Sequence, residues 1–547
     1  MTEYNTGPQF NLIDEPWISV LDKNGYACNM SIMDTIASAG DLFSLAGDVP
    51  TQSFALLRLL LAILHRSLRN RESLLAGPRN IDEWEYLFNN WSYMVERASE
   101  YLKVFHNRFY LLHSVQPFFQ VANLESSNNT ISTLEKIVID IPNGEPMFTQ
   151  RIGKGIEKIS FAEAARWLVH AHAFDPSGIR TGAIGDPRIV GGKGYPIGPG
   201  WLGQIGGVHL IGKTLQETLM LNLIVYPTIG IETQVDDLPP WERDPLDSAE
   251  GNERPPRGFI DIYTWQSRRI RLYSNSESIT GVLLCQGDKI TPYNRHTIEP
   301  MTAWRYSDLQ SKKFKSHIYM PKLHKNDRSF WRGLSSLLPH ALGDDTNMKS
   351  SAAKSLTPGI IRWASVIAVY LMQKNLSVQP TKAIGIVYGN QNAVVDDLID
   401  DQLELPIALL SDEDGKLTKI AIDAVSATEN AVKALENLAG GLAQASGSDS
   451  LEGPKSAART EAYAALDFPF RNWLKSLSAL DEDLESIWYK QARAIIWAIG
   501  QNLLVDAGSA AWAGRIVEDK KYYIDSVRCD ITFRTQLNKA LPRVISE

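Results

Sequence analysis

The sequence has few cysteines and no long apolar run. Its cysteines, Cys28, Cys285 and Cys529, stand far apart, so neither a cysteine zinc site nor a disulfide scaffold is expected, and a reducing cytoplasm fits. The most apolar early run, 56–64, contains Arg58 and is too short to cross a bilayer. The first residues show no secretory signal pattern. We therefore expect a cytoplasmic protein.

The chain also lacks an excess of basic residues. It carries 55 Lys and Arg against 63 Asp and Glu, which gives a formal net charge of -8. This charge excludes a protein wrapped wholesale in nucleic acid, but it leaves open a local basic contact on one subunit of a larger assembly. At 547 residues the chain exceeds one comfortable hydrophobic core, so we expect at least two domains.

Fingerprints of nucleotide-dependent and hydrolytic enzymes are missing or incomplete. No GxxxxGK[ST] loop and no GxSxG motif occurs. Residues 198–203 have the sequence GPGWLG, which matches GxGxxG, but prolines flank the match and no clear helix opens on it. Because a dinucleotide site needs a strand before the glycines and a helix after them, such a site is disfavoured here.

Two polar clusters suggest metal ligands but have simpler interpretations. His170 and His172 are two residues apart, a spacing that points them to different sides of a helix. Satisfied or exposed histidines are therefore favoured over a metal site. An acidic run, which comprises Asp396, Asp397, Asp400 and Asp401, is more typical of a solvated helix face than of a metal site.

Glycine, in contrast, is concentrated in one stretch. Twelve of the 38 glycines fall between Gly178 and Gly212. Glycine at this density costs conformational entropy, so the backbone there is expected to take positive φ or to come very close to a neighbour. Two interpretations remain open: a long irregular surface loop, or a backbone surface laid against a nucleic-acid groove.

The first 400 residues predict a mixture of strands and helices. An extended segment at 10–20 is followed by a turn at Lys23-Asn24-Gly25 that would close a hairpin. Helices are predicted at 31–39, at about 52–70 with Thr51 as its cap, at 81–100, and at 161–173 with Ser160 as its cap. Within strands predicted over 258–286, residues 265–272 alternate apolar and basic positions, which puts basic side chains on a face that could meet phosphate or solvent.

From about Asp400 the pattern changes to helix formers with a period of 3.6 residues. Four helical segments are predicted, at 417–442, 455–480, 484–504 and 522–541, with Gly440-Gly441 among the breaks. Four helices with short links pack most economically as a bundle. The predicted fold class is α+β, with a large mixed α/β N-terminal domain over 1–400 and a C-terminal four-helix bundle over 401–547.

Two short polar turns could carry contacts to a ligand. Residues 388–393, with the sequence YGNQNA, form a polar tip ahead of 394–399, and amide side chains suit base edges and groove floors because they both donate and accept. Taken alone, the pattern predicts a helix-capping turn. Gly287-Asp288-Lys289 likewise predicts a hairpin turn with an exposed lysine.

The opening residues 10–20, FNLIDEPWISV, resemble the start of the large subunit of the type I-E CRISPR surveillance complex, Cascade, which is the CasA family. Residues 117–120, the loop at Phe148, the glycine-rich stretch, the turn at 389–393 and the C-terminal helices follow in the family's order. The resemblance therefore covers essentially the whole chain, and the family's two-part architecture agrees with the division near Asp400.

The resemblance implies a non-catalytic DNA-recognition subunit without a cofactor. It implies that the chain recognises the protospacer-adjacent motif (PAM) of foreign duplex DNA through the minor groove, promotes unwinding and R-loop formation, and helps to recruit a helicase-nuclease. The implied partners are the other Cascade subunits, the guide RNA, the target DNA and that helicase-nuclease. Some relatives carry clustered cysteines in mid-chain, and because this sequence lacks them, no zinc is expected.

The resemblance also assigns site residues. Phe148, Thr149 and Gln150 match the start of a loop that docks on the 5′ end of the guide RNA and its capping subunit. The residues that it assigns to the PAM are Gly178, Gly182 and Gly185 of a glycine loop, Lys289 as a minor-groove lysine, and Asn390 and Gln391 at a wedge pushed between the strands.

Two other classes of function stay open. One is a nucleotide-dependent hydrolase that uses the glycine-rich stretch and the carboxylates between Asp396 and Asp401. The other is a purely architectural subunit, which would assemble with partners but show no preference for a PAM.

Overall fold

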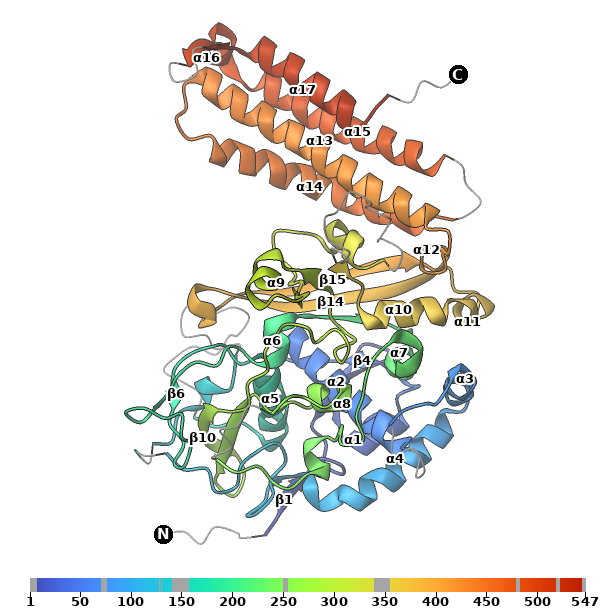
Figure 1. The fold of residues 1–547 in the computed structure, drawn as a ribbon, viewed down its shortest axis with the longest axis vertical. Helices are drawn as coiled ribbons and strands as arrows, with labels where there is room; N and C mark the ends of the chain where they lie inside the picture. Colours follow the sequence, from blue (N-terminus) through green and yellow to red (C-terminus); the bar gives the residue numbers. More distant parts are fainter. Residues whose placement is uncertain are drawn as a thin grey trace. The chain divides into compact units, whose positions relative to one another are not determined.

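The computed structural model describes residues 7–69, 76–126, 128, 130–139, 157–248, 254–338, 355–478, 483–517 and 522–543. The chain divides into two compact units. The first unit comprises Met1–Arg328, Asn347–Ile367 and Pro380–Gln402, and the second comprises Ser329–Thr346, Ala368–Gln379 and Leu403–Glu547. Figure 1 shows the helices and strands of both.

The first unit opens with two small sheets. Strand β1 (Gln9–Asn11) pairs with β5 (Tyr110–Leu112). Strand β2 (Ile18–Asp22) lies between β3 (Ala27–Met30) and β4 (Leu42–Leu45). The turn between β2 and β3 contains Gly25 at φ +83°, a left-handed conformation that glycine adopts without strain. The predicted hairpin is confirmed.

Helices α1 (Ile32–Ala37), α2 (Pro50–Ser67), α3 (Ile81–Asn89) and α4 (Trp91–Phe105) follow. Two predictions were wrong here. Thr51 does not cap α2, because proline already starts the helix at Pro50 and Thr51 lies inside it. The helix predicted over 81–100 is two helices, because Asn90 between them has φ -126° and ψ 60°.

The middle of the first unit holds α5 (Phe161–Phe174), which Ser160 caps as predicted by accepting a hydrogen bond from Glu163 N–H. The glycine-rich stretch after it contains only short elements. They are β6 (Arg180–Thr181), β7 (Lys193–Gly194), α6 (Trp201–Ile205) and β8 (Gly207–Leu210), and α7 (Leu215–Asn222) and α8 (Phe259–Tyr263) come next.

Strands β9 (Arg268–Ser274) and β10 (Ile279–Gln286) form an antiparallel pair. A further sheet has the order β12-β11-β13. Its strands β11 (Trp304–Tyr306), β12 (Tyr319–Pro321) and β13 (Ser355–Leu356) accompany α9 (Asp308–Phe314) and α10 (Gly359–Val366). Short 3-10 turns lie at His106–Arg108, Leu134–Lys136, Tyr226–Ile229, Pro240–Glu242, Phe330–Ser336 and Asn390–Asn392.

A long hairpin of β14 (Val378–Tyr388) and β15 (Val395–Pro406) joins β8 in a sheet with the order β15-β14-β8. The acidic run lies on β15, so its assignment to a helix face was wrong. The strand alternates with a period of two residues, since Val395, Ile399 and Leu403 are buried while Asp396 and Asp400 are exposed.

The second unit is mainly helical. Its long helices α13 (Lys416–Ser446), α14 (Glu452–Lys475), α15 (Leu484–Val505) and α17 (Ser526–Ala540) run side by side (Figure 1). Each of the four predicted helical segments overlaps one of them, with ends that differ by up to five residues. The shorter elements are α11 (Ala368–Gln373), α12 (Ile407–Leu410), α16 (Gly508–Ala513), β16 (Arg515–Val517) and β17 (Tyr522–Ile524). The predicted fold class is confirmed.

Gly440 and Gly441 were wrongly taken as a helix break, because both lie inside α13. A Cβ atom added at Gly441 would lie 2.8 Å from Cys529 Sγ of α17, and one added at Gly440 would meet Lys455 of α14. The glycines therefore allow close helix approach instead of ending the helix. In the part of the chain that the structure describes, no helix combines the length and apolar character needed to cross a membrane.

Candidate nucleic-acid interface

The glycine-rich segment, residues 176–200, begins where α5 ends and is held by a buried arginine. Arg268, on β9, is 1% exposed and donates through Nε to the Asp175 carboxylate. Its Nη2 donates to the backbone carbonyls of Pro176, at 3.1 Å, and Gly198, at 2.9 Å. Arg180 adds a second ion pair to Asp175 at 2.8 Å. One guanidinium therefore joins the beginning of the segment to its end.

The predicted glycines lie on a backbone that folds back on itself. The Gly178 carbonyl accepts a hydrogen bond of 2.9 Å from Gln286 Nε2. A Cβ at Gly182 would lie 2.6 Å from Ile189 Cγ2, so a larger residue does not fit there. Gly185 has φ +88° and is exposed. The segment combines a tightly packed interior with exposed backbone, as a surface that approaches a groove requires.

Asn390 and Gln391 lie at the tip of the hairpin of β14 and β15 (Figure 1), so the helix-capping turn predicted from the local pattern was wrong. Gln391 has φ 55° and ψ 20°, and Asn392 has φ 57°. Two successive left-handed residues give the turn type that matches the twist of a hairpin, closed here by Ala393 N–H to Asn390 O at 3.1 Å. A left-handed residue other than glycine costs about 1 kcal/mol or more. The tip stores strain while exposing the Gln391 side chain.

The hairpin tip is anchored to the glycine-rich segment. Ser177 N–H donates to Asn392 O at 2.8 Å. Ser177 precedes Gly178 and Asn392 follows Gln391, so this bond brings two predicted recognition elements together. They are more than two hundred residues apart in the sequence.

Lys289 is exposed, but it does not lie in a hairpin turn as predicted. Gly287 and Asp288 continue the ladder of β10, because their N–H groups donate to Ser267 O at 3.1 Å and Gln266 O at 3.2 Å. A turn would have left these donors to local acceptors. The Asp288 carboxylate accepts from Arg269 Nη2 at 2.8 Å, which fixes the residue directly before Lys289.

Arg188 connects residues 287–289, the Lys289 segment, to the glycine-rich segment. Its Nη1 donates to Gly287 O at 2.9 Å, and its guanidinium pairs with Asp186 at 2.8 Å. Asp186 follows Gly185, so Gly185 and Lys289 belong to elements that share one hydrogen-bonded arginine. The described part of the predicted site is thus assembled from three distant stretches of sequence.

Sequence reasoning missed the roles of Arg268 and Arg269. The alternation in 265–272 predicted basic residues on a face open to phosphate or solvent, whereas both side chains are 1% exposed and ion-paired. Burial lowers the pKa of the Arg268 guanidinium, and the Asp175 carboxylate opposes that shift. The local signal is a pair of arginines within a run of buried residues, but Asp175 lies 93 residues away.

His170 and His172 each form one hydrogen bond through Nε2, to different partners, while the Nδ1 atom of each ring is buried with no hydrogen-bond partner among the described residues. His170 Nε2 and Thr51 Oγ1 form a hydrogen bond of 2.9 Å, and His172 Nε2 donates to Phe119 O at 2.8 Å. Burial lowers the pKa of His170 to about 3 and that of His172 to about 4, so both rings are neutral at pH 7. Among the described residues, no group of three or more His, Cys, Asp or Glu is placed to hold a metal ion.

Two of the three glycines of the GxGxxG match, Gly200 and Gly203, fill packing positions. A Cβ at Gly200 would lie 2.5 Å from the Ala173 backbone, and one at Gly203 would overlap the Tyr388 side chain. Helix α6 is five residues long and mostly buried. The long, exposed helix start that binds a pyrophosphate is not formed by these residues.

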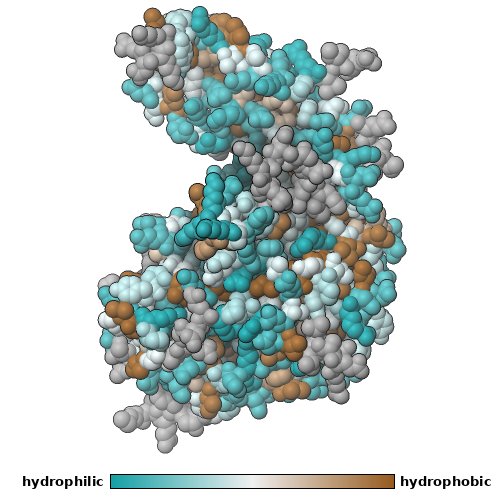
Figure 2. All heavy atoms as spheres, in the orientation of Figure 1, coloured by the Kyte–Doolittle hydropathy of each residue, from teal (hydrophilic) through white to brown (hydrophobic). Residues whose placement is uncertain are grey.

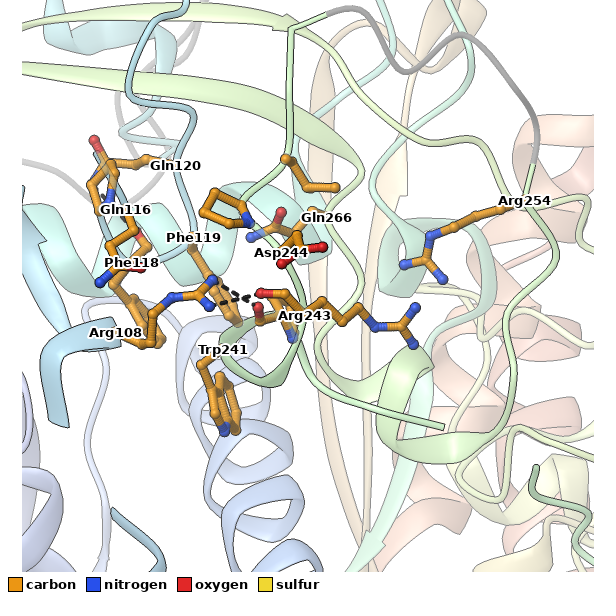
Figure 3. A pocket seen from close by; sticks show the side chains of 14 residues that line it. Arg108, Gln116, Phe118, Phe119, Gln120, Trp241, Arg243, Asp244, Arg254 and Gln266 are labelled. Atoms are coloured by element: carbon orange, nitrogen blue, oxygen red, sulfur yellow. Dashed lines mark hydrogen bonds between the residues drawn. The ribbon is translucent and has the colours of Figure 1, made fainter. Parts of the chain in front are cut away.

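Two hollows in the first unit are small. One, drawn in Figure 3, has a cavity volume of about 30 Å³ beside stacked aromatic rings, and in it Arg108 donates to the carbonyls of Arg243 and Pro240 at 2.7 and 3.1 Å. The other has a volume of about 60 Å³ and is lined in part by His170 and Arg180. Both hollows can hold water molecules, but neither can hold a nucleotide.

The family model described as CRISPR-associated protein Cse1 matches residues 11–499 of this chain. The chain belongs to the Cse1 family. The resemblance to the large subunit of type I-E Cascade is thereby confirmed.

Individual relatives agree with this assignment. The CRISPR-associated protein CasA/Cse1 of Thermus thermophilus is 31% identical over 344 residues, which are 61% of this chain and 61% of that protein. The crystal structure of Thermobifida fusca Cse1 has a TM-score of 0.86 at 41% identity, with 98% of each chain covered. That of Cse1 from Acidimicrobium ferrooxidans has a TM-score of 0.79 at 29% identity, covering 98% of this chain and 99% of the other.

The predicted guide-RNA loop is not among the residues that the structure describes. Phe148, Thr149 and Gln150 lie outside the described residues. Their assignment stays a prediction, as do the DNA roles of Gly178, Gly182, Gly185, Lys289, Asn390 and Gln391.

Proposed function

We propose that this Cse1 family member is the non-catalytic large subunit of an RNA-guided CRISPR surveillance complex that recognises the PAM of foreign duplex DNA. The hydrogen bonds that join the glycine-rich segment to the Gln391 tip and to the segment of Lys289 carry the proposal. Its partners are the other subunits, the guide RNA, the target DNA and the helicase-nuclease that it helps to recruit.

The chemistry of these elements suits the minor groove. That groove offers acceptors on every base pair and one extra donor on guanine. Glycine backbone can lie close to the groove because it has no side chain, Lys289 can donate to acceptors on the groove floor, and Gln391 can donate or accept. Since the minor-groove code is degenerate, such a surface tolerates several related PAM sequences.

The Gln391 tip acts as the wedge that starts unwinding. Inserting a side chain beside a base pair costs a few kcal/mol of unstacking, which phosphate contacts and pairing with the guide offset. The strained turn and the bond between Ser177 and Asn392 hold the tip in one geometry before DNA arrives. A pre-formed wedge spends less binding free energy on its own ordering.

Two further assignments belong to this proposal. The loop at Phe148, Thr149 and Gln150 docks on the 5′ end of the guide RNA and its capping subunit. The functional division of the chain falls near Asp400, with PAM recognition in 1–400 and the helical bundle in 401–547.

Binding of the guide-loaded complex, with and without this chain, to duplexes that differ only in the PAM tests the proposal. Tight binding that needs both the chain and the correct PAM is expected. Equal binding without the chain would overturn the proposal, and binding that needs the chain but ignores the PAM would indicate an architectural subunit.

No observation favours the nucleotide-dependent hydrolase. In the glycine-rich stretch that it would use, Gly200 packs against Ala173 and Gly203 against Tyr388. The carboxylates from Asp396 to Asp401 are spread along β15, and Asp400 pairs with Lys382 at 2.8 Å.

A further inference from the structure

We propose that Arg268 and Arg269 are positioning residues that set the spacing between the elements that contact the PAM. Arg268 holds the glycine-rich segment, and Arg269 holds the segment that carries Lys289. The inference rests on the proposed function, which it deepens by naming the residues that orient the contact surface.

The two arginines reach different elements because they are neighbours on a strand. Successive side chains of a strand point to opposite faces. From β9, Arg268 therefore reaches Asp175, Pro176 and Gly198, whereas Arg269 reaches Asp288. A single stretch of backbone thus fixes both recognition elements.

Arg269 is anchored on more than one side. Its Nη2 donates to Asp288 Oδ1 at 2.8 Å and its Nε donates to Asp247 O at 3.1 Å. The Asp288 carbonyl accepts a further bond of 2.9 Å from Trp265 Nε1. Asp288 is held through its side chain and its backbone, so the direction in which Lys289 leaves the fold is determined.

Arginine chemistry is needed at both positions. The planar guanidinium offers several donors in a fixed fork, whereas lysine offers one compact ammonium on a flexible stem. Arg268 uses its fork to bind one carboxylate and two carbonyls from different ends of the glycine-rich segment. A lysine would keep the charge but could not span these acceptors.

Buried ion pairs are a poor way to gain stability, because desolvation of both charges offsets much of their attraction. They are directional, however, and fix one arrangement where apolar contacts would allow several. Two adjacent pairs of this kind, each 1% and 4% exposed, lie beneath the exposed elements that the proposed function assigns to DNA. Their position beneath these elements therefore favours a role in fixing the arrangement of the backbone over a role in stabilising the fold.

The molecule supplies a matched control. Arg66 is also 1% exposed and forms a bidentate pair with a glutamate, Glu242, with bonds of 2.6 and 2.5 Å. No hydrogen bond that the structure gives to Arg66 leads to the glycine-rich segment, to Lys289 or to the hairpin tip. Arg66→Lys therefore makes the same chemical change at the same burial without touching the recognition elements.

The test is a double-mutant cycle on the guide-loaded complex. The measured quantity is PAM discrimination, the ratio of dissociation constants for target duplexes with a mutated and with the correct PAM. Arg269→Lys is expected to lower this ratio by about threefold to tenfold. In a Lys289→Ala background, Arg269→Lys should cause no further loss, because it acts through Lys289.

Arg268→Lys should lower discrimination in both backgrounds, since it acts on the glycine-rich segment. Arg66→Lys should leave discrimination unchanged even where it lowers the melting temperature. Asp288→Asn, which keeps the shape of the partner side chain, should reproduce the Arg269→Lys result and covers the case in which that variant folds poorly.

Two results would overturn the inference: equal losses from Arg269→Lys with and without Lys289, or an equal loss of discrimination from Arg66→Lys. A different result would contradict the proposed function itself. If Lys289→Ala alone leaves PAM binding and discrimination unchanged, the lysine contact is wrong and the Arg269 assignment fails with it, whereas Arg268→Lys still decides the role of the glycine-rich segment.

Discussion

The glycine-rich segment and the helical bundle are held together in opposite ways. The segment contains regular elements of only two residues each, and buried polar side chains such as Arg268 and Gln286 fix its backbone. The bundle has helices of 31, 24, 22 and 15 residues around buried aromatic residues such as Trp488 and Phe470.

The two regions differ because one must keep an exposed backbone in a fixed shape and the other only needs a packed interior. Apolar packing is non-directional and tolerates volume-conserving changes. Hydrogen bonds to a guanidinium or an amide fix particular backbone atoms, so an exposed loop with little core of its own can still keep one shape. On the face drawn in Figure 2 the bundle surface mixes hydrophilic with scattered hydrophobic residues, which fits a region whose order comes from its interior.

The largest expected effect is the loss of an aromatic residue from the bundle core. Trp488 is fully buried, its ring centroid lies 4.9 Å from that of Phe470, and its Nε1 donates to Thr428 Oγ1 at 2.9 Å. Trp488→Ala should lower the free energy of unfolding by about 3–5 kcal/mol. Denaturant unfolding measures this, with Trp512→Ala, at a side chain 62% exposed, as the control. Similar losses in both variants would contradict the bundle core described here.

A methyl group in the glycine-rich segment should have the next largest effect. In Gly182→Ala the new Cβ would lie 2.6 Å from Ile189 Cγ2 and 2.8 Å from a backbone carbonyl oxygen. Such overpacking costs about 1–3 kcal/mol and should reduce PAM discrimination. Gly191→Ala is the control, because φ +59° is strained for alanine but nothing lies within 4 Å. Discrimination that falls equally in both variants would show that packing at Gly182 is not what matters.

Acid should destabilise the first unit more than the second. His65 and His170 are buried without charge, and burial lowers the pKa of each to about 3. The unfolded chain binds a proton at each ring below its ordinary pKa of about 6.5, so stability is fully present above that pH. Between about pH 6.5 and 3 each histidine removes about 1.4 kcal/mol per pH unit.

The described residues of the second unit contain no histidine, so it should lose less stability in the upper part of this range. Amide hydrogen exchange at pH 7 and pH 5 can follow α2 and α5 against α13 and α15. Faster exchange in α13 than in α2 at pH 5, relative to pH 7, would show that the buried histidines do not control the acid response.

A smaller effect should distinguish the backbone strain at Gln391 from the contribution of its side-chain amide. Gln391 is left-handed, a conformation that glycine adopts at little cost. Gln391→Gly should therefore be more stable than Gln391→Ala by about 1 kcal/mol. Both variants should unwind a PAM-bearing duplex poorly while binding a pre-opened bubble almost normally. Unwinding that survives in Gln391→Gly would mean that the turn, and not the amide, is the wedge.

Local signals in the sequence predicted much of the fold. Ser160 caps α5 through a bond to a residue three positions later, and Gly25 closes a short turn, so both depend on neighbours alone. The periodicity of the bundle helices is also local. The Thr51 prediction failed for a local reason, because Pro50 already starts α2. The prediction for the arginines of β9 failed because their partners, Asp175 and Asp288, are distant or belong to another strand segment.

The candidate site was found by family resemblance and not by its chemistry. The turn at 388–393 and the segment 287–289 each suggested an ordinary surface turn. Each is joined to the glycine-rich segment, through Ser177 bonding to Asn392 and through Arg188 bonding to Gly287, contacts that span about two hundred and one hundred residues. No short-range pattern encodes such pairs, so only the fold shows that both elements are bonded to the glycine-rich segment.

We propose that the glycine-rich segment, Lys289 and Gln391 recognise the PAM through the minor groove. Changing one groove of the PAM at a time, in duplexes offered to the guide-loaded complex, tests this proposal. Inosine for guanine removes the minor-groove amino group, and 7-deazapurines remove the major-groove N7 acceptor. If these elements recognise the PAM in the minor groove, minor-groove changes should alter affinity and 7-deaza changes should leave it as it was. Affinity that falls with the 7-deazapurines and stays constant with inosine would contradict the proposal.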